Sequence, residues 1–327
     1  MTMNIILITL TVLAVVGISL SIPPRAPAPL AALNQAFANA SMAGLPPLAH
    51  FRGADGQGLA YRHYRPQSAD SNLGSVTLMH GSSADSRSMH PLAQALARAG
   101  FAVYTLDIRG HGASGEHGHI AYLGQLDNDL HQFATQVQPT PPALLSGFSA
   151  GGGLAFRIAA GAHAKDFAGY LLLAPFLGHD APTSQAGNGD WGSISLPRMI
   201  ALTVLNRLGI TAFNPLPVLR FALNDWGQQH LTPTYDYNLA FNMRPGPDLT
   251  GDIARLSAPM ALVVGNEDTL MRADAYAPLF AASPLAMSIT RVAGADHAGL
   301  ILQADAISAI VTNAKRLMHT AALISAP

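Results

Sequence analysis

The sequence contains no cysteine, and charged residues make up only 11% of its 327 positions. The absence of cysteine excludes disulfide bonds, thiolate catalysis and cysteine-ligated zinc, and it leaves the redox compartment open. The net charge is −1 at pH 7, and no basic stripe is present, so no nucleic-acid partner is expected. No internal repeat is visible. The length suits one large α/β domain with an insertion.

The longest uncharged apolar run lies at the amino terminus, from Ile5 to Ile22. In a helix, roughly 18 residues at about 1.5 Å each span most of a hydrocarbon core, so residues 1–22 are expected to insert into a membrane. A retained anchor is favoured over a cleaved signal peptide, which would export the chain, and over a soluble core segment, because no lysine or arginine precedes the run. Arg25 argues mildly for a cytoplasmic catalytic domain, but the side of the membrane stays open. Residues 23–49, rich in Pro and Ala, are expected to form a linker or a surface arm.

From residue 50 onward, short apolar runs alternate with segments of helical periodicity. Gly169 to Ala174 is a continuous apolar run that suits a strand buried on both faces, whereas Leu59 to Tyr64 alternates as an edge strand does. Repeated crossover units of this kind build a mostly parallel, doubly wound sheet. We expect one α/β core from residues 50–175 and 250–327. Its strands are expected at Leu59–Tyr64, Ser75–Met79, Phe101–Leu106, Ala143–Ser146, Gly169–Ala174, Met260–Val264 and Ala286–Val292, and its helices at His90–Ala99, Tyr122–Val137, Ala150–Gly161, Arg272–Ala281 and Leu300–His319.

Residues 176–249 interrupt this alternation and are rich in Pro, Gly and Asn, with helix-like pieces at Leu196–Leu208 and Pro217–Leu223. A structureless loop of that length is implausible in a compact domain. The segment is therefore predicted to be a largely helical cap over the carboxyl ends of the strands, with a separate small domain as the alternative. It carries more apolar side chains than one packed face needs, so part of them are expected to line an acyl pocket. They are Trp191, Ile194, Leu196, Met199, Ile200, Leu202, Leu205, Leu208, Leu219, Phe221, Leu223 and Trp226.

The pentapeptide Gly147-Phe148-Ser149-Ala150-Gly151 lies between a short apolar run and a helix-like stretch. A serine on a tight strand-to-helix turn needs small neighbours, and Gly147 and Gly151 meet that requirement. The pattern is typical of a nucleophile elbow, in which the hydroxyl points out of the sheet toward a base.

A hydroxyl nucleophile needs a histidine to take its proton and a carboxylate to hold that histidine. Each should follow a later strand, the acid first and the histidine second. Asp268 follows the run that ends at Val264, and His297 follows the last predicted strand. Glu267 is the competing acid, Asp268 could alternatively cap a helix, and Asp296 is interpreted as a turn residue.

The oxyanion that forms when serine attacks a carbonyl needs two preorganised backbone donors. One comes from the residue after the nucleophile and the other from a loop after an earlier strand. Ala150 N–H and Ser82 N–H fit these positions, and Gly81 lets the second loop approach the site. His80 is expected to brace this loop rather than to take part in the chemistry.

Two other patterns resemble binding motifs but lack essential parts. His111, His117 and His119 lie close together without matching carboxylates, so a metal site is not expected. Gly151-Gly152-Gly153 lacks the Lys-Ser/Thr of a phosphate-binding loop and is instead expected to allow close helix packing. The sequence therefore predicts no metal and no cofactor.

Taken together, these motifs resemble the α/β-hydrolase superfamily, and within it the group of monoacylglycerol lipases, lysophospholipases and serine aminopeptidase-like enzymes. The resemblance covers about residues 50 to 319 and implies a catalytic triad of Ser149, Asp268 and His297. The chain departs from the family in having Phe148 where relatives often carry His, and in lacking a second glycine after His80-Gly81 in the oxyanion loop. The matching motifs are His80-Gly-Ser-Ser83, Asp107-Ile-Arg-Gly-His-Gly-Ala-Ser114, Gly147-Phe-Ser-Ala-Gly151, Gly265-Asn-Glu-Asp268 and Asp296-His297.

The expected function is a membrane-associated serine hydrolase that cleaves lipid-like or medium-chain acyl esters through an acyl-enzyme intermediate. The alternatives are an amidase or aminopeptidase of the same fold, and a non-catalytic binding protein. A peptidase would need a carboxylate cluster for the substrate amine, whereas the acidic residues of the cap are scattered singly. The expected partners are a small acyl ester and the membrane, and the oligomeric state stays open.

Overall fold

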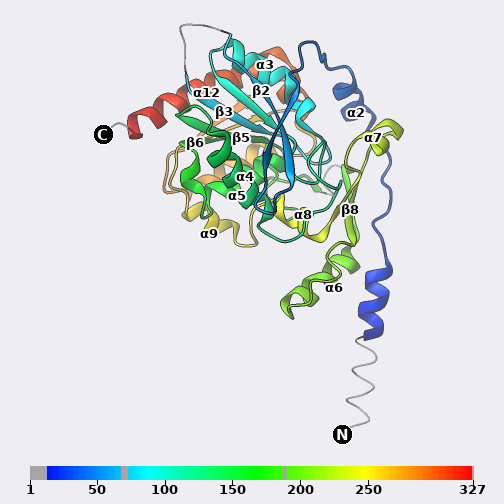
Figure 1. The fold of residues 1–327 in the computed structure, drawn as a ribbon. Coiled ribbons are helices and arrows are strands. Elements are labelled where there is room, and N and C mark those ends of the chain that lie inside the picture. The colour runs from blue at the N-terminus through cyan, green and yellow to red at the C-terminus, as the bar shows by residue number, and fades with distance from the viewer. Residues whose placement is uncertain (1–12, 68–72, 187–189, 326–327) are drawn as a thin grey trace.

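The computed structural model describes residues 13–67, 73–186 and 190–325 (Figure 1). Its centre is an eight-stranded sheet with the strand order β1-β2-β4-β3-β5-β6-β10-β11. β2 pairs antiparallel with both β1 and β4, and all other neighbours are parallel. The predicted mostly parallel, doubly wound sheet is confirmed. The strands are β1 (Leu48–Arg52), β2 (Gly58–Tyr64), β3 (Ser75–Met79), β4 (Ala102–Leu106), β5 (Ala143–Phe148), β6 (Gly169–Leu173), β10 (Met260–Gly265) and β11 (Ser288–Val292).

Helices cover both faces of this sheet (Figure 1). The chain steps from β3 to β4 in one direction and from β5 to β6 in the other, so right-handed crossovers put the connecting helices α3 (His90–Arg98) and α5 (Ala150–Ala159) on opposite faces. The long α12 (Ala304–Ser325) packs against α3, and α4 (Gln125–Val137) is joined to α5 by an ion pair between Asp127 and Arg157. The shorter helices of the core are α9 (Leu249–Ala254), α10 (Tyr276–Phe280) and α11 (Gly299–Leu302).

The core strands β3, β4, β6 and β10 are buried along their whole length, as expected for parallel strands covered on both faces. The expectation that Leu59–Tyr64 forms an edge strand is wrong, because β1 pairs on its outer side. β1 buries only Phe51. Its sequence therefore lacks the apolar pattern by which a strand could be predicted.

The segment 176–249 forms a cap that is only partly helical. Pro217–Leu223, expected as a helix, contains the strand β8, which pairs with neighbours on both sides. Pairing with segments distant in the sequence overrides the local helical pattern here. The elements of the cap are β7 (Gly192–Ile194), α6 (Leu196–Arg207), β8 (Pro217–Phe221), α7 (Asp225–His230), β9 (Thr234–Asp236) and α8 (Tyr237–Asn242).

In the segment 23–49, expected as a linker or a surface arm, residues 23–46 pack on the cap and the core. The arm contains the helix α2 (Ala31–Ala38), and the first strand of the core, β1, begins at Leu48, close to the expected start of the core at residue 50. Leu30 N–H donates to Ala222 O of the cap over 3.2 Å, and Asn34 Nδ2 donates to the same carbonyl over 3.0 Å. Below, residues 23–46 are called the arm.

The expected membrane segment from Ile5 to Ile22 lies partly outside the described residues, which begin at 13. Residues 13–21 are helical. Over the described ranges, none of the helices combines the length and the apolar character needed to cross a bilayer.

Candidate active site

Ser149 lies on a sharp turn between β5 and α5, with φ 54° and ψ −118°. A positive φ is uncommon for a residue with a Cβ, and this strain is typical of a nucleophile elbow. The glycines on either side are sterically required. A Cβ on Gly147 would lie 2.0 Å from Gly151 O, and a Cβ on Gly151 would lie 2.3 Å from His80 O.

His297 and Asp268 are brought together by the loops after β11 and β10. His297 Nδ1 lies 2.7 Å from Asp268 Oδ2, and because a carboxylate only accepts, Nδ1–H is the donor. The other carboxylate oxygen, Oδ1, accepts the N–H groups of Leu270 and Met271, both over 2.8 Å. This arrangement fixes the tautomer of His297 and leaves its Nε2 free to act as a base.

Of the two candidate acids, the structure brings only Asp268 to the histidine. Glu267 is exposed. Asp296 Oδ1 accepts the Gly299 N–H over 2.6 Å, which is the contact expected of a turn residue. Phe148, where relatives often carry His, packs its ring 4.7 Å from that of His297.

Ser149 and His297 line the same cavity, although no hydrogen bond joins their side chains among the residues described. Catalytic hydrogen bonds of this kind often tighten only in the complex with substrate. The two side chains therefore face the same cavity, and Asp268 sets the orientation of the imidazole in it.

The two expected oxyanion donors also face this space, since Ser82 and Ala150 line a cavity together with Ser149. Within the described part of the chain, neither backbone N–H donates to a protein acceptor. A Cβ on Gly81 would lie 3.2 Å from Ser149 Cβ, so the oxyanion loop packs directly against the nucleophile. Both N–H groups are thus available to a substrate oxygen.

His80 is fully buried and braces the oxyanion loop. Its Nε2 accepts the Ile108 N–H over 3.1 Å, and its Nδ1 lies 2.8 Å from Gly81 O. Since a backbone N–H can only donate, the proton of the neutral ring lies on Nδ1. Burial lowers the pKa of His80, which favours this neutral form.

A second chain of hydrogen bonds joins the oxyanion loop to the cap through Tyr235 of β9, a residue that sequence reasoning missed. Ser83 N–H donates to Tyr235 Oη over 2.8 Å, and this hydroxyl donates to His111 Nε2 over 2.6 Å. Burial lowers the pKa of His111 well below its ordinary value. The histidine of the Gly-His-Gly pattern thus has a structural role.

His119, a second histidine of this loop, pairs with Asp236 over 2.6 Å. Burial raises the pKa of Asp236 to about 6.

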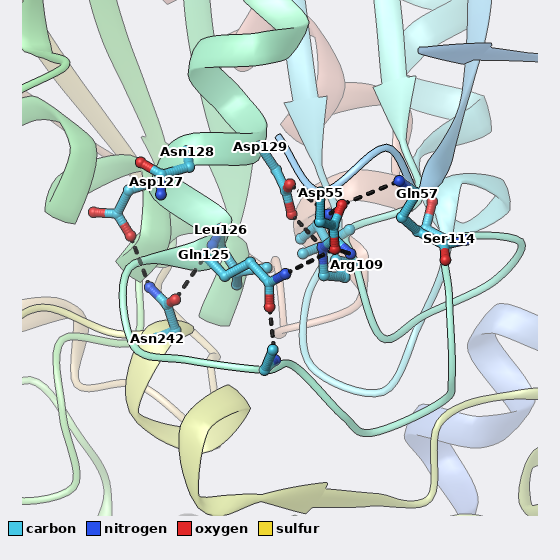
Figure 2. A network of polar contacts seen from close by, with 12 residues as sticks. Asp55, Gln57, Arg109, Ser114, Gln125, Leu126, Asp127, Asn128, Asp129 and Asn242 are labelled. Atoms are coloured by element: carbon cyan, nitrogen blue, oxygen red, sulfur yellow. Dashed lines mark hydrogen bonds and ion pairs between the residues drawn. The ribbon is translucent and has the colours of Figure 1, made fainter. Parts of the chain in front are cut away.

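The loop after β4 is held by the ion-pair network of Figure 2, which is centred on Arg109. Arg109 Nε donates to Asp129 Oδ2 over 2.7 Å, and Nη1 donates to Asp55 Oδ2 over 2.9 Å. Nearby, Asn242 Nδ2 of the cap donates to Asp127 Oδ2 of α4 over 2.8 Å. The guanidinium with its two carboxylate partners thus links this loop to α4 and to the turn between β1 and β2.

Among the described residues, one group of metal-type ligands occurs, formed by His131, His163 and Asp166. His131 Nδ1 lies 2.8 Å from Asp166 Oδ2, and the two imidazole rings stack at 4.4 Å. These residues line neither of the cavities at Ser149.

Two cavities meet at Ser149, one of about 460 Å³ and one of about 90 Å³. Both are also lined by Trp191 of the cap. The helix α2 of the arm forms part of the wall of the larger cavity through Leu33 and Phe37, which the sequence did not indicate. Of the cap residues expected to line a pocket, these do so: Trp191, Ile194, Met199, Leu219, Phe221, Leu223 and Trp226.

A family model described as serine aminopeptidase S33 matches residues 70–301. The chain therefore belongs to this family of α/β-hydrolases. Among curated proteins, the monoacylglycerol lipase of Mycolicibacterium smegmatis is 33% identical over 131 residues, which are 38% of this chain and 45% of that protein. The chain thus matches less than half the length of this relative.

Solved structures of similar fold cover most of the chain. The monoacylglycerol lipase of Paleococcus ferrophilus has a TM-score of 0.59 at 20% identity, covering 80% of this chain and 98% of that one. A soluble variant of the monoglyceride lipase from Saccharomyces cerevisiae has a TM-score of 0.62 at 18% identity, covering 84% and 96%. At these identities the likeness establishes the α/β-hydrolase fold.

Proposed function

We propose that this chain is a serine hydrolase that cleaves lipid-like or medium-chain acyl esters through an acyl-enzyme intermediate. The observation that carries the proposal is the position of Ser149, on a strained elbow in a cavity whose wall holds His297, with Asp268 hydrogen-bonded to that histidine. Ser149 supplies the nucleophile, His297 with its fixed tautomer the base, and Asp268 the acid that orients the base.

In the proposed reaction, Ser149 Oγ attacks the ester carbonyl and its proton passes to His297 Nε2. Asp268 stabilises the imidazolium, and the N–H groups of Ser82 and Ala150 donate to the oxyanion. The imidazolium then protonates the leaving alcohol, which leaves the acyl group on Ser149. Water, deprotonated by the same histidine, attacks the acyl-enzyme and releases the acid.

The cavity walls favour an ester over a peptide with a free amino terminus. Most of the residues that line the two cavities are apolar, and the one carboxylate among them is Asp85. Asp85 is already paired with Arg87, whose Nε donates to Oδ2 over 2.9 Å. A substrate ammonium group would find no free carboxylate among the described lining residues.

We also propose that the enzyme works at a membrane. Support comes from two helices with exposed apolar side chains, α6 and the helix of residues 13–21, which project from the same side of the molecule (Figure 1). They are joined at Leu20, whose carbonyl accepts Arg198 Nε over 2.7 Å. The exposed apolar side chains are Leu13, Val15, Ile18, Leu196, Ile200, Val204 and Leu208.

Both proposals are tested with p-nitrophenyl esters and cell fractionation. The wild-type chain should hydrolyse the hexanoate ester, whereas Ser149→Ala and His297→Ala should retain only a trace of turnover at an unchanged melting temperature. The full-length chain should fractionate with membranes, and removal of residues 1–24 should release an active enzyme. Substantial turnover by Ser149→Ala would contradict the first proposal, and a full-length chain found in the soluble fraction at its complete mass would contradict the second.

A further inference from the structure

Arg244 lies just after α8 and lines the smaller cavity together with Ser149 and Ser82. Its guanidinium carbon lies 4.2 Å from the centroid of the Phe241 ring, so one face of the group is covered by an aromatic surface. The cavity is otherwise walled mostly by apolar side chains. A charged guanidinium is unusual in a cavity with mostly apolar walls.

In the part of the chain that the structure describes, no protein acceptor pairs with the N–H groups of this guanidinium. Within the described ranges, no carboxylate oxygen lies within 4.0 Å of it and no acceptor oxygen is within hydrogen-bond distance. Every other described arginine that is buried or half-buried donates to an oxygen of the protein. These are Arg62, Arg87, Arg109, Arg157, Arg198 and Arg220.

Burial of an unpaired charge is costly unless a ligand supplies the counter-charge. Burial lowers the pKa of Arg244, and exposed Asp180, which lies beyond ion-pair distance, acts in the opposite direction. An arginine stays protonated at neutral pH all the same. Its planar fork of donors matches the two oxygens of a carboxylate or phosphate.

We propose that Arg244 binds an anionic group of the substrate, a carboxylate or a phosphate, while the ester carbonyl lies at Ser149. The inference rests on the proposed ester hydrolysis and names its substrate class, an ester with a negative charge close to the scissile bond. At about 10–15 Å³ for each water-sized atom, the small cavity of about 90 Å³ accommodates a short anionic portion. The larger cavity is then left for the long apolar portion.

The first experiment compares two esters that differ only at the end of the acyl chain, p-nitrophenyl hexanoate and the p-nitrophenyl half-ester of adipic acid, each corrected for spontaneous hydrolysis. The measured quantity is the ratio of kcat/KM, anionic over neutral. In Arg244→Met this ratio should fall about 10- to 100-fold, as expected for a charge-assisted hydrogen bond, mainly through KM. Arg244→Lys, which keeps the charge but loses the fork, should give an intermediate ratio.

The second experiment places the charge on the alcohol side, with monodecanoylglycerol and monodecanoylglycerol phosphate as the pair. If Arg244→Met lowers the ratio with the glycerol esters but not with the adipate pair, the anion that Arg244 binds is a phosphate of the leaving group. A drop with adipate alone would assign it to the acyl portion.

Arg207→Gln is the matched control, because it removes the same charge from the exposed surface of the cap, and it should leave both ratios unchanged.

Removal of the unpaired cation in Arg244→Met should not lower the melting temperature. If Arg244→Met loses stability and slows both members of each pair equally, Arg244 is structural and the proposal is overturned. Hydrolysis of the neutral esters without an anionic preference in either pair overturns the role of Arg244 alone. A chain that hydrolyses no ester instead overturns the proposed function.

Discussion

Trp191 of the cap donates its indole N–H to Ser82 Oγ over a distance of 2.8 Å. This contact joins the cap to the residue whose backbone N–H is proposed to bind the oxyanion, and Trp191 lines both cavities. The position of the oxyanion donor is therefore coupled to the cap.

Replacement of Trp191 by Phe keeps an aromatic ring and removes the hydrogen bond. We expect kcat to fall several-fold, because the loss of a hydrogen bond of about 1 kcal/mol loosens the oxyanion loop. Ser82→Ala removes the acceptor of the same bond and should have a similar effect. In a double-mutant cycle on the hexanoate ester, the combined variant should be little worse than either single one. Fully additive losses would show that the bond does not position the loop.

Asp268→Asn should lower kcat by about four orders of magnitude, since an amide no longer holds His297 in the tautomer that it needs as a base. Glu267→Gln is the matched control, because Glu267 is adjacent in sequence and exposed, and it should stay within a few-fold of the wild type. The measurement is steady-state hydrolysis of the hexanoate ester. Greater damage from Glu267→Gln would reverse the assignment of the acid.

Local sequence signals were enough to predict the parallel sheet, the elbow and the two late loops. Buried parallel strands are continuous apolar runs, as in Gly169–Leu173, and the elbow needs glycines at fixed positions because the backbone approaches closely there. These features depend on neighbouring residues or on strand order, so a single sequence reveals them.

The parts that were missed depend on contacts between distant segments. Tyr235 meets Ser83 across 152 positions, and α2 lines a cavity at a place where Leu30 and Asn34 bond to the distant cap. The strand β8 likewise follows from pairing with β7 and β9. Neither residue type nor periodicity in one segment indicates which remote segment will face it.

The arm predicts a dependence of the reaction on acyl-chain length. In the wild type, kcat/KM should rise from acetyl to octanoyl esters, because each buried methylene contributes up to about 0.8 kcal/mol of transition-state binding. Phe37→Ala removes part of the wall of the larger cavity and should flatten this rise, with the largest loss for the octanoyl ester. Gln35→Ala, on the exposed side of α2, is the control. A flat or falling profile in the wild type would instead favour a small polar ester or an amide.

Because His111 is buried, we expect it to make the fold less stable in mild acid. Burial lowers its pKa well below the ordinary value, so below about pH 6.5 the unfolded chain binds a proton that the folded chain does not. The contribution of His111 to the free energy of unfolding should therefore fall as the pH drops from 7 to 5, by up to about 1.4 kcal/mol per pH unit.

Urea denaturation at pH 7, 6 and 5 measures this contribution. His111→Gln keeps an acceptor for the Tyr235 hydroxyl and should be less stable at pH 7 but less sensitive to acid, whereas His50→Gln, at an exposed site of β1, should behave as the wild type. Equal slopes in wild type and His111→Gln would mean that His111 is not held neutral by the fold.

The assignment of Ser149 as the nucleophile is tested most directly by mapping the adduct of a fluorophosphonate probe, using mass spectrometry of the digested chain. We expect one adduct, on the peptide that contains Ser149, and no adduct when the probe is added to His297→Ala or Ser149→Ala. A wild-type chain that is not labelled, or that is labelled on another serine, would contradict this assignment.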